Sequence, residues 1–532
     1  MIASARHLAR LFTIFRTLAR HDVLFLLKDA GIAPGVLFAA RLFAAKSTGI
    51  DERPGERLAK AFQELGPTFI KLGQILSTRP DILGDAVTAD LADLQDRLPP
   101  FPGAIAKDIV AQELDAPLDA LFSAFDDVPV AAASIAQVHF AMTADGDPVA
   151  VKVLRPGIEV SFNRDLELMR WVAREVERRR PEYRRLRPLE VVRTFEEAVR
   201  VEMDFRLEAA AADELAENFK GDPTYRVPAI DWRRTARRVM TQARIAGMPI
   251  DEVDGLRAAG LDPLDIVRKA AEIFFKQVFR DGFFHADQHP GNLFVGPDGA
   301  IVAVDFGIMG RLDRRTRRYL GEMLKAFLER DYRRVAEVHF EAGYVPADKS
   351  VDAFAQACRA IAEPIFDRPQ NEISIARLLA QLFRVTETFE METQPQLLLL
   401  QKTMLVAEGV GRTLAPQSNM WSLAQPLIEQ WERDYFGPEA RIAIALDEVA
   451  QGLTRLPSLV SNIEKSAQII AQGQLMGGLV ADAAASGPAG RRRIDPEAYR
   501  RSAETFRPRP TRSPIHVVFL IAMVLLVVLY LL

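Results

Sequence analysis

The chain has 532 residues, of which 49% are hydrophobic and 26% charged, and its formal net charge is −4. This length accommodates two or more domains with complete cores. The slightly acidic balance excludes the global excess of positive charge that many nucleic-acid-binding proteins carry, so we expect no nucleic-acid partner. Cys358 is the single cysteine, which excludes a disulfide within the chain and favours a reducing compartment.

The first fifty residues predict basic amphipathic helices. Arginines and apolar residues recur there at helical spacing: Arg6, Leu8, Arg10, Leu11, Phe12, Phe15, Arg16, Leu18 and Arg20. No long apolar run with a cleavage site is present, so this segment is not a secretory signal. Two interpretations stay open: a helix that lies on an anionic membrane surface, and a helix that packs on its own protein.

Residues 51–118 predict a helical extension with an unusual polar pair. Lys71 and Gln74, in the run Lys71-Leu-Gly-Gln74, fall on one stripe of an otherwise apolar helix. A lysine and a glutamine in such a helix normally need polar partners. The alternative interpretation is that both side chains lie on a solvated face.

From residue 119 onward the pattern changes to strands. Residues 131–139 and 148–154 are separated by an Asp-Gly-Asp turn, which indicates a β-hairpin. The second run contains Val-Ala-Val followed by Lys152, the kinase pattern in which the lysine reaches the α- and β-phosphates of the nucleotide.

The hairpin before Lys152 should cover the nucleotide phosphates, and it is alanine-rich where an ordinary kinase has a glycine-rich loop. Alanine carries a Cβ, so its backbone cannot enter the left-handed region freely or approach a phosphate as closely as glycine does. We therefore expect nucleotide to bind here with its phosphates held differently. The candidate nucleotide-binding residues are Ala131, Ala132, Ala133, Ser134, Ile135, Ala136, Gln137 and Lys152.

Residues 195–219 predict one helix that carries three acids, Glu202, Asp204 and Glu208. Asp204 and Glu208 share a face, whereas Glu202 is turned away from both. One acid should pair with Lys152, as the glutamate of helix αC does in kinases. Glu202 would then point at a metal or at Lys71. On spacing alone, each acid is more often a surface residue.

The stretch with the most specific chemistry covers residues 281–307. Asn292 follows Asp287 by five residues, and Asp305 opens an Asp-Phe-Gly turn. A protein kinase needs one aspartate to meet the acceptor hydroxyl or water, and an asparagine and a second aspartate to bind Mg²⁺ at the nucleotide phosphates. We therefore predict that Asp287 is catalytic, that Asn292 and Asp305 are metal ligands, and that ATP and Mg²⁺ are the cofactors.

Two short apolar runs, 293–295 and 301–304, flank a Gly-Pro-Asp-Gly turn and predict a β-hairpin inside this stretch. A zinc site is the alternative interpretation, since His285 and His289 are four apart, as in a zinc-binding helix. A proline and a glycine follow His289 at once, which argues against a continuing helix.

After Gly307, helical periodicity resumes almost at once, with no long activation segment and no Ala-Pro-Glu. A peptide substrate would have little to dock on, which argues against an ordinary protein kinase. Residues 481–514 are rich in Arg, Pro, Gly and Ser and predict a linker. Residues 515–532 are almost unbroken apolar sequence, about 27 Å long as a helix. They predict a transmembrane helix whose basic flank stays cytoplasmic; a buried core helix is the alternative.

Taken together, these motifs resemble the UbiB family of atypical kinase-like proteins, also called the ADCK type. The match covers roughly residues 50–330 and rests on Lys71-x-Gly-Gln74, the alanine-rich loop, Lys152, Glu202-x-Asp204, Glu208, His285-Ala-Asp-x-His-Pro-Gly-Asn292 and Asp305-Phe-Gly307. The resemblance implies an α+β, two-lobed protein-kinase-like fold with an N-terminal helical extension over the active site and a C-terminal transmembrane helix. The expected segments are basic amphipathic helices (1–50), the extension (51–118), an N-lobe (119–248), a helical C-lobe (249–480), the linker (481–514) and the membrane helix (515–532).

The resemblance also implies roles for individual residues. Lys152 would pair with Glu208, which joins the nucleotide-binding residues. The extension would fill the place where a peptide substrate usually sits, through Lys71, Gln74 and Glu202. The implied catalytic residues are Asp287, Lys71 and Glu202. One departure lies in the expected inter-lobe hinge at 241–247, because the family usually carries an acidic and an aromatic residue near Gly247.

Members of this family support ubiquinone biosynthesis at a membrane, through ATP hydrolysis or phosphorylation of a small or lipid substrate. The resemblance thus implies an ATP-dependent phosphotransferase or ATPase, anchored in a bacterial inner membrane with its catalytic domain in the cytoplasm. The expected partners are inner-membrane lipid and polyprenyl quinone precursors, with other ubiquinone-biosynthesis enzymes and a second copy of the chain as further candidates. A pseudokinase scaffold that assembles biosynthetic enzymes and a small-molecule or lipid kinase stay open as alternatives.

Overall fold

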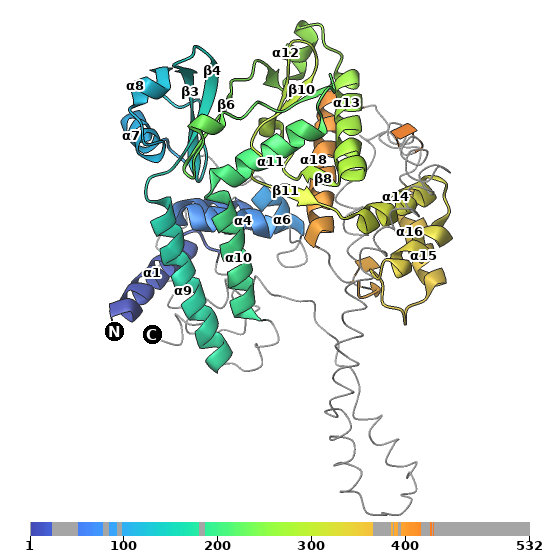
Figure 1. Cartoon of the computed structure of the whole chain (residues 1–532). Coiled ribbons are helices and arrows are strands. Elements are labelled where there is room, and N and C mark those ends of the chain that lie inside the picture. Colours follow the sequence, from blue (N-terminus) through green and yellow to red (C-terminus); the bar gives the residue numbers. More distant parts are fainter. Residues whose placement is uncertain are drawn as a thin grey trace, which may run out of the picture. The chain divides into compact units, whose positions relative to one another are not determined.

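The computed structural model divides into two compact units, residues 1–427 with 513–532, and residues 428–512. The helices and strands below all lie in the first unit (Figure 1). The described residues are 2–23, 52–77, 85–92, 98–179, 187–364, 385–386, 388–391, 395–416, 426–427 and 429. The predicted linker and the predicted membrane helix at 515–532 lie outside these residues. Among the described helices, none is both long and apolar enough to cross a membrane.

A five-stranded antiparallel sheet forms the predicted N-lobe. Its strand order is β1 (Phe122–Phe125), β3 (Ala136–Thr143), β4 (Pro148–Leu154) and β6 (Val239–Ala243), with β2 (Ala131–Ala132) also paired to β3. The predicted hairpin is confirmed, since Val138 of β3 pairs with Lys152 of β4. Side chains alternate along a strand. Val151 and Val153 therefore enter the core beneath α7 (Gly103–Glu113) and α8 (Leu118–Leu121), and Lys152 projects from the other face.

Three helices lie between β4 and β6 in the chain: α9 (Ile158–Arg179), α10 (Pro188–Glu202) and α11 (Phe205–Asn218). The single helix predicted over 195–219 is therefore wrong. The chain breaks at Asp204, which is extended at φ −124° and accepts a hydrogen bond from the Arg206 backbone N–H. Aspartate is a strong N-cap because its carboxylate satisfies a free amide of the first turn. The break lets Glu202 end one helix while Glu208 lies in the first turn of the next.

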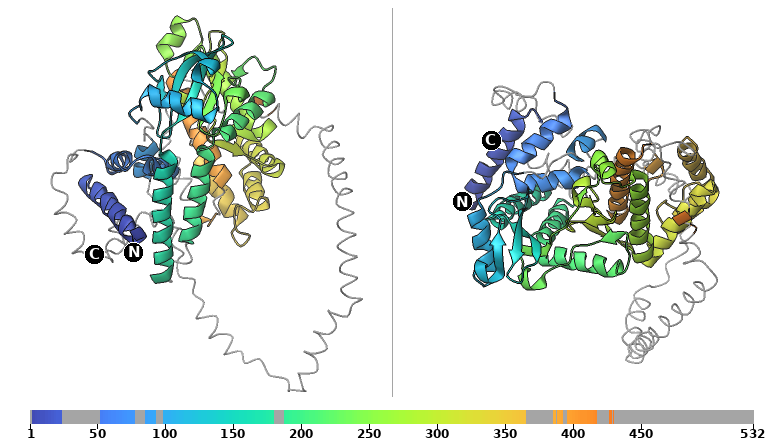
Figure 2. Two further views of the ribbon diagram at one scale, coloured as in Figure 1. Left: turned by 60° about the vertical axis from the view of Figure 1, so that its left-hand side comes forward. Right: turned by 90° about the horizontal axis from the view of Figure 1, so that it is seen from above.

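The predicted extension contains α3 (Pro54–Leu65), α4 (Pro67–Ser77), α6 (Asp85–Ala92) and α7, and α1 (Ile2–Arg20) lies in the predicted segment before it. α1 buries Leu11 and Ile14 in a core shared with α3, α4, α9 and α10. The ribbon of α1 lies beside that of α3 (Figure 2). Arg10 of α1 donates to Asp165 of α9 at 2.8 Å and to the Leu65 carbonyl at 3.0 Å. This face of the predicted amphipathic helix therefore packs on its own protein. Leu8 and Phe12 stay exposed.

A second sheet has the order β5 (Tyr225–Arg226), β10 (Ile301–Ala303), β9 (Leu293–Val295) and β7 (Met248–Pro249), so it combines residues from the ranges predicted for both lobes. The predicted hairpin is confirmed by the antiparallel pairing of β9 with β10. Gly247 lies directly before β7, where a Cβ would stand 2.8 Å from the carbonyl oxygen of Val295. The backbone at residue 247 therefore lies too close to Val295 for any residue with a Cβ, so this position requires glycine. A third sheet pairs β8 (Phe283–His285) with β11 (Met309–Arg311).

Helices make up the rest of the described C-lobe. They are α12 (Val253–Ala258), α13 (Pro263–Phe275) with its π-helical continuation Lys276–Asp281, α14 (Arg314–Leu328), α15 (Tyr332–Glu341), α16 (Val351–Ala362) and α18 (Pro395–Leu414). α18 lies beside α13, and its Val410 and Leu414 share a core with Phe283 of β8 (Figure 1). α14 begins three residues after β11 ends, so the predicted absence of a long activation segment is confirmed.

Candidate active site

Lys152 stands at the centre of a compact charge cluster. Its Nζ lies 2.7 Å from Glu208 Oε1 and 3.2 Å from Asp305 Oδ1. The lysine comes from β4, the glutamate from the first turn of α11, and the aspartate from the segment after β10. The ring of Phe205 lies 5.3 Å from Nζ. The structure thus contains the expected pair of Lys152 with Glu208, and it adds Asp305 to that pair.

Burial and the shared lysine set the protonation of the cluster. Burial raises the pKa of Glu208, and Lys152 opposes that effect. Burial also acts to raise the pKa of Asp305, but Lys152 outweighs it and holds the pKa below its ordinary value. Burial lowers the pKa of Lys152, yet Asp305 and Glu208 together hold it above its ordinary value. The lysine is therefore charged at neutral pH, and Asp305 is an ionised carboxylate.

The Asp-Phe-Gly turn is held in one conformation by its backbone. Asp305 has φ +64°, in the left-handed region that aspartate tolerates better than most residues. The Gly307 N–H donates to Asp305 Oδ1 at 3.3 Å, and the Phe306 N–H donates to Glu208 Oε1 at the same distance. Phe306 is buried against the ring of His285. The turn therefore presents the Asp305 side chain outward while its phenylalanine anchors it.

The loop after β8 brings Asp287 and Asn292 together. Asn292 Nδ2 donates to the Asp287 carbonyl at 3.0 Å and to Asp287 Oδ2 at 3.3 Å. The Val304 N–H, next to Asp305, donates to the Asn292 carbonyl at 2.9 Å. His285 Nδ1 accepts the Asp287 backbone N–H at 3.1 Å. These bonds join the catalytic-loop residues to the strand that ends at the Asp-Phe-Gly turn.

The two histidines of the zinc alternative have separate structural roles. His285 lies in β8, is fully buried, and has its pKa lowered by that burial, so its ring is neutral. His289 precedes the short 3₁₀ turn Pro290–Asn292, and its Nδ1 accepts the Gly291 N–H at 3.2 Å. They do not share a helix, so the zinc interpretation is not supported.

The chemistry of Asn292 and Asp305 fits Mg²⁺. The amide nitrogen of Asn292 is engaged with Asp287, which leaves its Oδ1 as the acceptor. The side chain of Asp305 is 47% exposed, so its carboxylate reaches the space in front of the turn. An amide oxygen and a carboxylate are hard ligands, and Mg²⁺ completes its shell with water and phosphate oxygens. Within the described chain, no three His, Cys, Asp or Glu residues gather as a self-sufficient metal site.

The alanine-rich loop forms the short hairpin between β2 and β3. The Ala133 N–H donates to the Ala136 carbonyl at 2.8 Å, and no residue of 131–137 has a positive φ. The side chain of Gln137 has a structural contact. Its buried amide exchanges two hydrogen bonds with the Phe101 backbone, at 3.0 and 3.1 Å. This side chain therefore holds the hairpin to residue 101, and a nucleotide contact of Gln137 stays a prediction.

Arg155 is a supporting residue of this loop that sequence reasoning missed. Its Nε donates to the Ala133 carbonyl at 2.9 Å, and its backbone N–H donates to the Ile135 carbonyl at 2.8 Å. The rest of its guanidinium donates to the carbonyls of Leu98 and Pro99. Its place directly after the strand of Lys152 is the only signal that the sequence offers. Arg155 thus ties the alanine-rich loop to the end of the extension.

The polar pair of the extension finds its partner in α10. Lys71 Nζ lies 2.5 Å from Glu202 Oε1 and donates to Gln74 Oε1 at 3.1 Å. Both charged side chains are mostly buried. Of the two directions expected for Glu202, the structure favours Lys71. The Lys71, Gln74 and Glu202 set therefore joins the extension to the helices behind the N-lobe.

Lys402 is a second residue that sequence reasoning missed. Its Nζ lies 2.9 Å from Asp287 Oδ1, although it comes from α18, more than one hundred residues later. Asp287 therefore has a protein donor on each carboxylate oxygen, Lys402 on one and Asn292 on the other. No motif surrounds Lys402, so only the packing of α18 reveals it.

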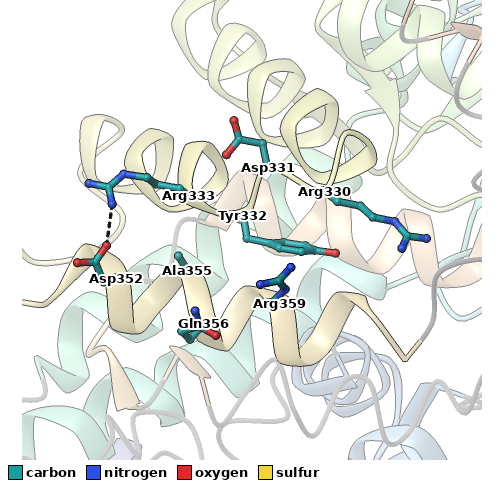
Figure 3. Close-up of a pocket in the computed structure, with 8 residues that line it drawn as sticks. All are labelled: Arg330, Asp331, Tyr332, Arg333, Asp352, Ala355, Gln356 and Arg359. Carbon is teal, nitrogen blue, oxygen red and sulfur yellow. Dashed lines mark hydrogen bonds and ion pairs between the residues drawn. The ribbon is translucent and has the colours of Figure 1, made fainter.

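A hollow of about 430 Å³ lies between α15 and α16 (Figure 3). Two of its arginines have partners within the lining: Arg333 bonds Asp352 at 2.9 Å, and the Arg359 guanidinium lies 5.5 Å from the ring of Tyr332. None of the candidate catalytic residues lines it. The hollow is therefore separate from the site built by Lys152, Asp287 and their partners.

Comparison with known proteins agrees with this geometry. Residues 93–339 match the ABC1 atypical kinase-like domain, and residues 358–419 match the UbiB helical domain. A protein named "Probable protein kinase UbiB" from Marinobacter nauticus is 46% identical over 409 residues, 76% of this chain and 75% of that protein. Proteins of the same name from Vibrio vulnificus and Aeromonas salmonicida are 43% and 44% identical, over 85% and 80% of this chain and 84% and 80% of theirs.

A solved structure shares the fold. It is the complex of Rv3197 with erythromycin from Mycobacterium tuberculosis, with 26% identity, a TM-score of 0.50, and coverage of 62% of this chain and 84% of that chain. The predicted kinase-like fold is therefore confirmed. With the matched domains and these relatives, the chain belongs to the UbiB family of atypical kinase-like proteins.

Proposed function

We propose that this protein is an ATP-dependent phosphotransferase or ATPase that binds Mg-ATP and supports ubiquinone biosynthesis by acting on polyprenyl-phenol lipid precursors. One observation carries the proposal. Lys152, Glu208 and Asp305 form one cluster, and Asp287 with Asn292 is joined to it through the Val304–Asn292 backbone bond. A chain that bound nucleotide for assembly alone would not need a catalytic-loop aspartate beside these groups.

Each residue has a task that its position supports. Lys152 is charged and faces the side on which Asp305 is exposed, as a phosphate-binding lysine must be. Asn292 and Asp305 would hold Mg²⁺, which when bound neutralises charge on the phosphates. Asp287 would orient the hydroxyl or water that accepts the phosphoryl group. Glu208 keeps the lysine in place, because it is buried and hydrogen-bonded to the Phe306 backbone.

The acceptor that we favour is small, lipidic or water. The extension joins α10 through the ion pair of Lys71 with Glu202. In this family, the extension is expected to cover the place where a peptide substrate usually binds. α14 begins at Arg314, directly after β11, so little chain is available to bind a peptide. The relatives carry the name of protein kinases, and our proposal differs from that name in the acceptor.

A membrane site of action has support from two segments. Residues 515–532 are nearly continuous apolar sequence behind an arginine-rich stretch. α1 exposes Leu8 and Phe12 while its other face packs on the protein. We propose a single-pass anchor in a bacterial inner membrane, where polyprenyl precursors reside.

The test uses the full chain with anionic liposomes, a polyprenyl phenol and Mg-ATP labelled in its γ-phosphate. Free phosphate and label on the phenol are measured together, beside Asp287→Asn. Lipid-stimulated phosphate release that Asp287→Asn removes identifies an ATPase, and label on the phenol identifies a lipid kinase. Nucleotide binding without turnover in the presence of both additions contradicts the proposal and favours a scaffold.

A further inference from the structure

We propose that Lys402 of α18 is a positioning residue of the active site, which holds the Asp287 carboxylate for phosphoryl transfer. The helical segment after the kinase-like domain then completes the catalytic site. This inference rests on the proposed function. It adds to that function a residue from outside the region that matches the kinase-like domain, since that match ends at residue 339.

The contact is specific in its geometry. Lys402 Nζ lies 2.9 Å from Asp287 Oδ1, and Asn292 Nδ2 lies 3.3 Å from Asp287 Oδ2. With one donor on each oxygen, the carboxylate cannot rotate freely about its bond. The side chains of Lys402 and Asp287 are 26% and 31% exposed, so the pair is only partly shielded from solvent. The lysine therefore restrains the carboxylate and still leaves it open on one side to an acceptor.

α18 is fixed well enough to carry such a residue. Val410 and Leu414 belong to the same buried core as Phe283, in the strand that leads to Asp287. Thr403, which follows Lys402 in the helix, is fully buried. A functional side chain on a packed helix is placed more reproducibly than one on a loop. The lysine and the catalytic loop are thus built on one shared core.

The catalytic loop lacks a cation of its own. From His285 to Asn292 it contains no lysine or arginine. A transferring phosphoryl group carries charge over its oxygens, and fixed cations near the acceptor lower the barrier. Lys402 brings a positive charge to within 2.9 Å of Asp287 Oδ1. Lys402 of α18 therefore supplies the positive charge that no lysine or arginine of the catalytic loop provides.

The opposite role would be an inhibitory clamp. A lysine that masks Asp287 would block the acceptor, and its removal would raise turnover. A merely structural ion pair would change stability without changing the chemical step. The substitution Lys402→Met separates the three roles, because it keeps much of the side-chain length and removes the charge.

The matched control is Lys269→Met. Lys269 lies on α13, its side chain is 24% exposed, and its Nζ pairs with Asp265 at 3.0 Å, so it loses a comparable ion pair away from Asp287. Phosphate release, the KM for ATP, Mg-ATP affinity and the thermal midpoint are measured on full-length wild type, Lys402→Met, Lys402→Arg and Lys269→Met. Lys402→Met should lower kcat on the order of 10²-fold with KM and affinity unchanged. Lys402→Arg should restore part of kcat, and Lys269→Met should behave as wild type.

Unchanged or raised kcat in Lys402→Met overturns the inference and leaves the proposed function intact. If wild type neither releases phosphate nor transfers it to the phenol, the proposed function fails, and the contact is judged by a double-mutant cycle in thermal midpoint. Lys402→Met and Asp287→Ala should then be non-additive, because each removes the same contact. Additive effects in that cycle overturn the inference independently of turnover.

Discussion

Lys152 faces two carboxylates whose surroundings differ, and the difference assigns their tasks. The side chain of Glu208 is 7% exposed and also accepts the Phe306 N–H, whereas that of Asp305 is 47% exposed. The buried acid can only hold the lysine. The exposed acid can hold the lysine and also reach a metal at the phosphates. Lys152 therefore connects the buried Glu208, which holds it in place, to the exposed Asp305, which can reach the metal.

Asp305→Asn tests the metal role at this scale. Asparagine tolerates the left-handed backbone at φ +64°, so the fold should persist, but the ionised ligand is lost. We expect Mg-dependent ATP affinity to fall on the order of 10–100-fold, measured by calorimetry with and without Mg²⁺. An unchanged thermal midpoint is the control. Wild-type Mg-ATP affinity in this variant would count against the site.

Ala132→Gly tests the steric account of the alanine-rich loop. Residues 131–137 have no positive φ, and a glycine would give the loop that freedom without removing a contact of a functional group. The ratio of ATP to ADP affinity, or autophosphorylation, should change. Ala132→Ser keeps a Cβ and should match wild type. Identical nucleotide preference in the glycine variant would contradict the account.

Buried histidines predict how stability depends on pH. Burial lowers the pKa of His285, His139 and His339 below the ordinary value of 6.5. Between that value and the lower folded-state pKa, the unfolded chain binds more protons, so stability is lost as pH falls below about 6.5. The thermal midpoint should be flat from pH 8 to about 7 and then drop toward pH 5.5. His285→Asn should reduce this slope, and an equal slope in that variant would show that His285 is not its source.

At the scale of elements, the extension and α10 share an apolar core and a mostly buried ion pair between Lys71 and Glu202. Lys71→Met removes the cation that lies 2.5 Å from Glu202 Oε1 at a mostly buried position, which should cost roughly 1–3 kcal/mol of unfolding free energy. Removing both charges as Lys71→Met with Glu202→Met should cost less than the sum of the single changes. Urea unfolding measures all three variants. Strict additivity would mean that the pair is not coupled.

The strands around the site could be predicted because alternation and turn residues are local signals. The pairing of Val138 with Lys152 follows directly from a short turn between two apolar runs. The break at Asp204 could not be predicted from the sequence, because aspartate also occurs on the surfaces of continuous helices. Whether it caps a new helix depends on the fold around it. The alanine-rich loop was located from its sequence, but the inward direction of Gln137 depends on Phe101, a distant residue.

At the scale of the molecule, the residues of the proposed site come from three segments of the chain. Lys71 lies before the region that matches the kinase-like domain, Asp287 lies within it, and Lys402 lies in the region that matches the UbiB helical domain. Sequence motifs identify Lys71 and Asp287, but no motif surrounds Lys402, which lies in an ordinary helical pattern. Its contact with Asp287 is a product of tertiary packing. The family's helical domain is therefore part of the catalytic architecture that we propose.

Membrane attachment is also a property of the whole molecule. Deleting residues 515–532 removes the apolar stretch that we propose as the anchor. The shortened protein should move from the membrane fraction to the soluble fraction, and it should no longer float with liposomes. If it stays bound, the exposed Leu8 and Phe12 of α1 are the next candidates, and substitution of both with serine distinguishes them.

The central claim is that Asp287 serves phosphoryl transfer from Mg-ATP. The most direct measurement is phosphate release by the purified full-length protein under saturating Mg-ATP, beside Asp287→Asn with its thermal midpoint as control. The account predicts release that Asp287→Asn lowers on the order of 10²–10⁴-fold while nucleotide still binds. Equal release by the two proteins would contradict it.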